Sequence, residues 1–196
     1  MSNFVKIKRI LNLCYINKSM KKQDIIVLSS IILVLIAMRS IFNIPNFNPI
    51  GAIALMGGIL FHKKTTAFLV TIGALFLGDV ILGLSSPIYM DYMFSTTFLF
   101  VYVAFLLMIL LGTALKNRAS LMTISLGSVV SAILFFLITN AGSWLALNYD
   151  RSLSGLMSAY SAGIPFFRAT LVSQLLFSLG IYIIYNLATQ RKTSLA

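Results

Sequence analysis

Uncharged polar residues lie close together in the second half of the chain. Asn140 and Trp144 are four residues apart, so they share one face of a helix if residues 119–147 are helical. An amide beside an indole can hold a flat polar molecule by hydrogen bonding and stacking. Tyr160 follows in a Gly/Ser-rich stretch, 148–164. These residue types predict a small-molecule site with residues 148–164 as a lid.

Two charged residues interrupt apolar sequence. Asp79 lies inside the run LFLGDVILG, and Arg168 lies near the start of the last apolar run. An ionisable group inside a membrane span costs several kcal/mol unless it is paired or hydrated. We therefore expect these two residues either to form a structural pair or to contact a ligand. With two amides from the turn before residue 50, the predicted substrate-binding residues are Asn46, Asn48, Asp79, Asn140, Trp144, Tyr160 and Arg168.

Each candidate also has a structural interpretation. Trp144 is equally consistent with an aromatic belt at the lipid headgroups. Asn140 is consistent with a hydrogen bond between helices. The polar residues nevertheless collect toward one side of the predicted membrane, and this asymmetry favours a binding site.

The composition predicts lipid as the solvent of this chain. Of the 196 residues 59% are hydrophobic and only 10% are charged, whereas a soluble domain has about 25% charged residues. One cysteine and one histidine give no metal-ligand cluster, so we expect no metal and no cofactor. The net charge of +11 comes from residues at the ends of apolar runs. That distribution favours contact with the lipid bilayer rather than with nucleic acid.

The apolar runs predict an all-α polytopic membrane protein with a basic amphipathic segment at 1–23, a transmembrane domain at 24–190 and a cytoplasmic tail at 191–196. The six expected spans are 25–43, 50–61, 65–84, 93–115, 119–147 and 166–188. Residues 85–92 are expected to form a loop.

The run at 50–61 reaches only about 18 Å as a helix, which is short of a hydrocarbon core of about 30 Å. It either extends into the flanking Pro/Asn turn or forms a short helix surrounded by protein. Small residues that predict close helix packing occur in it, at Gly51, Ala54, Gly57 and Gly58.

The basic residues predict the orientation. Twelve of the 15 Lys and Arg residues fall at 1–23, 62–64, 116–118 and the C-terminal tail, which six spans place on one side. The remaining three are Arg39, Arg151 and Arg168. The positive-inside rule then puts both termini in the cytoplasm and the chain in the cytoplasmic membrane.

Four stretches carry a family resemblance. The string NFNPIGAIALMGG at 46–58 resembles the NF(T/S)P-(I/V)-G-A-x-A-L-F-G-G signature of a family of uncharacterised prokaryotic membrane proteins. LFLGDVILG at 75–83, FFLITNAGSW at 135–144, and Gly155-Leu followed by YSAGIPFF at 160–167 agree with it. That family is similar to the S components of energy-coupling-factor (ECF) transporters.

The resemblance implies a six-helix bundle that captures a vitamin or metal complex outside the cell. It also implies an ATP-driven energising module as a partner. The first span lacks the Ala-x-x-x-Ala pair with which S components dock on that module, so this coupling is left open.

We therefore expect a substrate-binding subunit for uptake of a small molecule. The alternative is a structural membrane subunit that recruits partners and transports nothing. An enzyme is not expected, because Asp79 is the only carboxylate within the six spans and the one histidine lies at the basic turn. The chain has no phosphate-binding Gly-rich Lys-Ser/Thr loop either.

Overall fold

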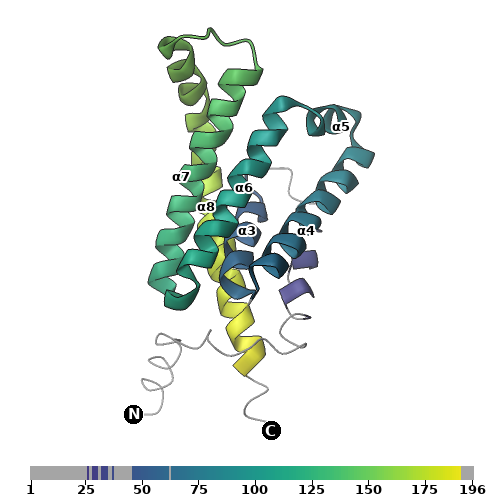
Figure 1. Ribbon diagram of the computed structural model, residues 1–196, viewed down its shortest axis with the longest axis vertical. Helices are drawn as coiled ribbons and strands as arrows, with labels where there is room; N and C mark the ends of the chain where they lie inside the picture. The colour runs from purple at the N-terminus through teal and green to yellow at the C-terminus, as the bar shows by residue number, and fades with distance from the viewer. Residues whose placement is uncertain are drawn as a thin grey trace.

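The computed structural model describes residues 46–61 and 63–190, with residues 26, 28–30, 32–34 and 37 of the first expected span. The expected N-terminal segment and C-terminal tail lie outside the described residues. The described part is helical and contains no strand. Its elements are α3 (Ile50–Leu60), α4 (Lys64–Ser85), α5 (Pro87–Met93), α6 (Thr96–Leu115), the 3-10 turn η1 (Lys116–Arg118), α7 (Leu121–Ala146) and α8 (Leu153–Gln190) (Figure 1).

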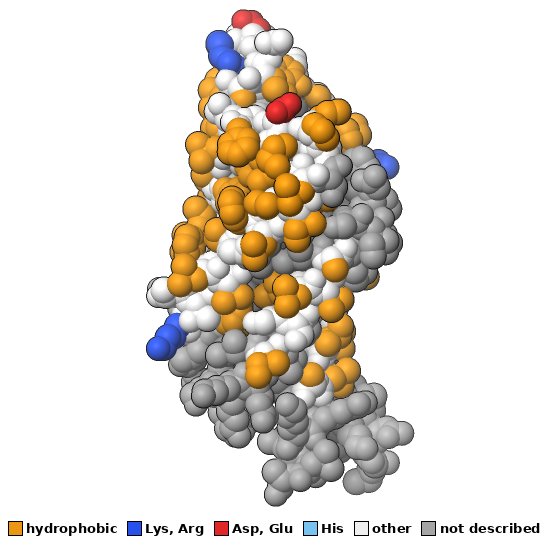
Figure 2. Space-filling model, turned by 90° about the vertical axis from the view of Figure 1, so that its right-hand side faces the viewer, with side chains coloured by type: hydrophobic (Ala, Val, Ile, Leu, Met, Phe, Trp, Pro, Cys, Tyr) orange, Lys and Arg blue, Asp and Glu red, His pale blue; other side chains and the backbone are white. Residues whose placement is uncertain are grey.

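Four of the described helices, α4, α6, α7 and α8, are long and apolar enough to cross a membrane. The 26 residues of α7 extend about 39 Å, which exceeds a hydrocarbon core of about 30 Å. On the face shown in Figure 2, hydrophobic side chains cover the middle of the molecule and acidic side chains lie near its upper end. The chain is therefore an all-α, multi-pass membrane protein.

The short helix α3 is enclosed by the longer helices. It packs against α4, α6, α7 and α8, and every residue in it except Gly51 is buried. A helix that is apolar all round has no face suited to water, so it is stable in the interior. Of the two expectations for residues 50–61, the structure has the helix surrounded by protein. Because α3 extends only about 16 Å, it does not reach the upper part of the bundle that the described helices form (Figure 1).

Glycines let α3 approach its neighbours closely. A Cβ atom at Gly58 would overlap the carbonyl oxygen of Ile109 and lie 2.9 Å from the Cα of Gly112 on α6. A Cβ at Gly57 would overlap the Thr71 hydroxyl on α4. The fully buried Ala54 lies on the same helix. Small residues of α3 therefore bring the backbones of α3 and α6 into contact.

Residues 85–92 differ from the expected loop, because most of them form helix α5. Ser86 caps this helix: its Oγ accepts a hydrogen bond of 3.3 Å from the Tyr89 amide. Pro87 occupies the first turn, where its missing N–H is harmless. The Ser-Pro pair is a helix-start signal that the loop prediction overlooked.

The last helix also differs, because α8 begins at Leu153 and not at residue 166. The prediction of a loop is therefore wrong for residues 153–164. Ser152 caps α8, with its Oγ accepting from the Gly155 amide at 3.2 Å. The helix continues through Pro165, although proline normally interrupts a helix. Extensive packing of α8 on α7 offsets this cost.

Candidate ligand-binding cavity

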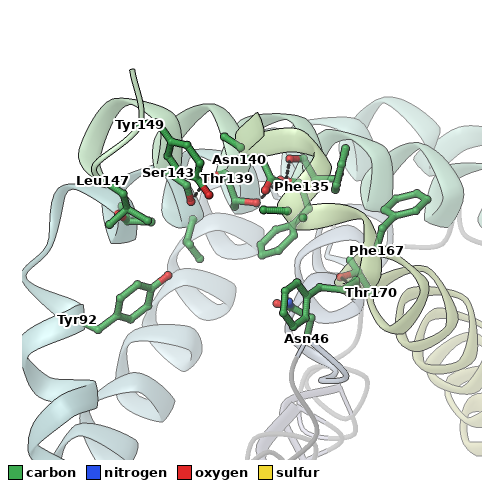
Figure 3. Close-up of a pocket in the computed structure, with 17 residues that line it drawn as sticks. Asn46, Tyr92, Phe135, Thr139, Asn140, Ser143, Leu147, Tyr149, Phe167 and Thr170 are labelled. Atoms are coloured by element: carbon green, nitrogen blue, oxygen red, sulfur yellow. Dashed lines mark hydrogen bonds between the residues drawn. The ribbon is translucent and has the colours of Figure 1, made fainter. Parts of the chain in front are cut away.

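A partly open cavity of about 280 Å³ lies where α3 begins and the longer helices continue. Figure 3 shows it with side chains from α5, α6, α7 and α8 around it. Because α3 starts only at this level, it does not extend into the space between the longer helices. The lining residues are Asn46, Tyr92, Thr97, Val101, Phe135, Phe136, Thr139, Asn140, Ser143, Leu147, Tyr149, Ala159, Ala162, Gly163, Phe166, Phe167 and Thr170.

The α7 wall of the cavity is polar. The Thr139 Oγ1 donates to the Phe135 carbonyl at 2.8 Å, and the Asn140 Nδ2 donates to the Phe136 carbonyl at 2.7 Å. The Ser143 Oγ donates to the Thr139 carbonyl at 3.1 Å. Each of these three side chains therefore donates a hydrogen bond to a backbone carbonyl in the preceding turn of α7.

Aromatic rings form much of the remaining wall. Phe136 of α7 and Phe167 of α8 meet edge to face with ring centroids 5.2 Å apart. Phe135 stacks on Phe105 of α6 at 5.7 Å. Figure 3 shows Tyr92 and Tyr149 on one side of the cavity with their hydroxyls directed into it. Such a mixture of rings and a few polar groups is typical of small-molecule sites.

Asn46 lines the cavity from the turn before α3. Its φ angle is 58°, a left-handed conformation that asparagine tolerates better than most residues. Two residues later, the Asn48 Oδ1 accepts a hydrogen bond of 3.1 Å from the Ile50 amide and so supports the start of α3. The turn thus directs one asparagine into the cavity and uses the other to hold the helix.

The model of a protein family of unknown function, DUF6580, matches residues 19–195. The chain belongs to this family. No curated protein and no solved structure matches it significantly. The family description assigns no activity to DUF6580, so function has to be inferred from the arrangement of side chains.

Two of the seven predicted site residues of this DUF6580 protein line the cavity, namely Asn46 and Asn140. The others are placed elsewhere. Asn48 supports α3, and Tyr160 braces the α7 wall: its hydroxyl donates to the Leu137 carbonyl at 2.9 Å and its ring packs 5.7 Å from Phe136. Tyr160 therefore supports the cavity from outside its lining.

Asp79 is buried on α4, with 2% of its surface exposed. The hydroxyls of Tyr89 and Tyr102 each donate to its carboxylate at 2.8 Å, one to each oxygen. Arg168 is exposed on α8 and forms no ion pair with Asp79 or with any other residue that the structure describes. The expected pair between these two residues is therefore absent, and tyrosine hydroxyls hold the carboxylate instead.

Trp144 also lies outside the lining. Its indole Nε1 donates to the Asp150 carbonyl at 2.9 Å, and the Arg151 guanidinium lies 6.0 Å from its ring centroid. Arg151 donates to the carbonyls of Trp144 and Leu145 at the end of α7. These contacts fasten the turn between α7 and α8.

Most of the polar lining was not predicted, including Thr139, Ser143 and Thr170, whereas Tyr149 falls within the predicted lid segment 148–164. A periodic signal for part of it is present in the sequence. Phe136, Thr139, Asn140, Ser143 and Leu147 recur at helical spacing, so they share one face of α7. That pattern predicts a mixed polar and aromatic face directed at a neighbouring helix.

Proposed function

We propose that this DUF6580 protein is a substrate-binding membrane subunit for uptake of a small molecule, similar to ECF S components. The observation that carries the proposal is the cavity lined by residues of α5, α6, α7 and α8, in which hydroxyls and amides lie among aromatic rings. A bundle that served only to span the membrane would gain stability by filling this space.

The proposal includes six spans, cytoplasmic termini and a place in the cytoplasmic membrane. The described cations near the α6–α7 turn support this orientation. Lys116 and Arg118 lie in η1, and the Lys116 Nζ donates to the carbonyl of Phe61, at the far end of α3 from Asn46. The positive-inside rule places this end in the cytoplasm. The cavity then faces the outer side, where an uptake protein meets its substrate.

In this proposal the chain captures the small molecule, and a partner protein supplies the energy for its transport. The proposed partner is an ATP-driven module, which would move the occupied subunit so that its cavity opens inward. The chain itself is proposed to bind ligand without catalysing a reaction. Binding by the purified subunit alone is therefore the first property to test.

The test compares two substitutions on α8 in detergent-purified protein. Ala162→Phe fills the cavity, because Ala162 lines it. Val172→Phe is the matched control, because Val172 is 54% exposed and outside the lining. Native mass spectrometry and thermal unfolding should detect small-molecule binding to the wild type and to Val172→Phe but not to Ala162→Phe. Absence of any bound or stabilising small molecule in the wild type contradicts the proposal.

A second candidate function is a structural subunit that recruits a membrane partner. Arg168 favours it, because an exposed arginine on a long apolar helix is more stable beside a polar or acidic group of a partner. Co-purification of the same membrane proteins with the wild type, but not with Arg168→Ala, would support this function. Retention of those proteins by the Ala162→Phe variant would separate it from ligand capture.

A further inference from the structure

The polar wall of the cavity determines which chemical groups a ligand must present. We propose that the cavity selects an uncharged, single-ring compound that directs N–H or O–H donors toward α7, and that it excludes carboxylates. This inference rests on the proposed function and narrows its substrate class.

The orientation of the Asn140 amide is fixed by its partner. The Phe136 carbonyl can only accept a hydrogen bond, so the amide nitrogen must face it, as the contact of 2.7 Å shows. The oxygen Oδ1 is then directed toward Gly163, another lining residue. Within the described part of the chain, no group donates to this oxygen. The cavity therefore contains an amide acceptor without a donor.

The neighbouring hydroxyls provide further hydrogen-bond acceptors beside this amide oxygen. A hydroxyl has one hydrogen and two lone pairs, and Thr139 and Ser143 both use their hydrogen on α7 carbonyls. On the opposite wall, the Thr170 Oγ1 donates to the Phe166 carbonyl at 3.3 Å. These four side chains can still accept hydrogen bonds. The three hydroxyls can donate to a ligand only by breaking an existing bond, whereas the Asn140 amide uses one of its two hydrogens on Phe136. A ligand without donors would leave buried acceptors unsatisfied, which is costly.

Charge complementarity is also missing from the lining. None of the 17 residues drawn around the cavity is Lys, Arg, His, Asp or Glu. An anion entering it would lose its hydration and find no counter-charge. A cation would find acceptors but no carboxylate, and burying an unpaired ion costs several kcal/mol. The described lining therefore favours an uncharged ligand.

Two further lining residues offer groups of a different kind, with Tyr149 near Ser143 and Asn46 near Thr170 (Figure 3). Asn46 presents a side-chain amide and Tyr149 a hydroxyl, and neither makes a hydrogen bond within the described part of the chain. Both can donate, so each suits a carbonyl or ring nitrogen of the ligand. The volume of about 280 Å³ equals the share of roughly nine water molecules at about 30 Å³ each. That space accommodates one ring with its substituents, held between phenylalanine faces.

The experiment uses four matched probes on the full-length protein in detergent. Benzamide is neutral and has N–H donors, methyl benzoate is neutral without donors, benzoate is an anion, and benzylamine is a cation at neutral pH. Thermal unfolding and titration calorimetry should rank benzamide first, with methyl benzoate about tenfold weaker because one or two hydrogen bonds are lost. Benzoate and benzylamine should be weaker still.

Variants of the α7 wall test the assigned contacts. Thr139→Val and Ser143→Ala remove acceptor oxygens with little change in volume. Each should weaken benzamide binding about threefold to tenfold and leave methyl benzoate binding unchanged. Ala162→Phe should abolish the binding of every probe.

The outcomes separate this inference from the proposed function. Tighter binding of benzoate, benzylamine or methyl benzoate than of benzamide, abolished by Ala162→Phe, would overturn the ligand class while leaving small-molecule capture intact. Equal effects of Thr139→Val on benzamide and methyl benzoate would also overturn it. Failure of all four probes, together with no other bound small molecule, would overturn both the inference and the uptake function.

Discussion

Gly163 on α8 lies directly against the side-chain amide of Asn140 on α7. A Cβ atom at Gly163 would overlap the Asn140 Oδ1 and lie 2.7 Å from both its Cγ and its Nδ2. The absence of a side chain at this position therefore sets the closest approach of the two helices at the cavity. It also leaves room for an amide whose nitrogen is already bonded to α7.

Gly163→Ala should displace the Asn140 amide and weaken ligand binding. The amide cannot retreat freely, because its hydrogen bond to Phe136 holds it on α7. We expect about a tenfold loss of affinity for the best small-molecule ligand, equal to about 1.4 kcal/mol. Calorimetry on purified protein measures this change.

Gly180→Ala is the matched control on the same helix. A Cβ at Gly180 meets no atom within 4 Å, so alanine should fit there without displacing a neighbour. The change should leave binding unchanged and raise stability slightly, because alanine favours helix by about 1 kcal/mol over glycine. Equal binding by the two variants would show that the Gly163–Asn140 contact does not shape the site.

Gly58→Ala should destabilise the whole bundle. The added methyl group would strike backbone atoms of α6, including the Ile109 carbonyl, and a helix backbone cannot move aside as a flexible side chain can. We expect a loss on the order of 2–3 kcal/mol from overpacking. Unfolding titrations in mixed micelles measure it. Gly73→Ala on α4, where a Cβ meets no atom within 4 Å, should show no such loss.

Tyr102→Phe should lower stability without changing ligand binding. It removes the hydroxyl that donates to the Asp79 Oδ2 at 2.8 Å, and the loss of one hydrogen bond to a buried acceptor costs about 1–3 kcal/mol. Asp79 is not part of the cavity lining. Thermal unfolding and ligand titration on the same preparation measure the two effects. A large loss of binding without a loss of stability would restore Asp79 as a candidate ligand contact.

Arg151→Lys should loosen the turn between α7 and α8 almost as much as Arg151→Ala. The guanidinium donates from separate nitrogens to the Trp144 and Leu145 carbonyls, and a lysine ammonium cannot reproduce that fork. Hydrogen exchange over residues 144–156 should accelerate in both variants, while exchange in α3 stays unchanged. Full protection in the lysine variant would show that charge alone holds the turn.

Helix locations were the most predictable feature. The helices α3, α4, α6 and α7 begin and end within a few residues of the ranges expected from apolar runs. Run length is a local property, and lipid-spanning helices need long apolar runs. Prediction failed at α5 and at the start of α8, where Gly, Ser and Pro indicated loops. There, Ser86 and Ser152 cap helices and packing on neighbours outweighs low helix propensity.

The sequence by itself determined that this chain is embedded in a membrane, folds into helices and has few ionisable residues within them. Only the tertiary structure decided which polar residues meet. Asn140 enters a cavity while Trp144, on the same helix, fastens a turn. Asp79 takes two tyrosines rather than Arg168. The physical reason is that spacing along one helix fixes a shared face, but the length of α3 and the depth at which each helix packs determine what that face meets.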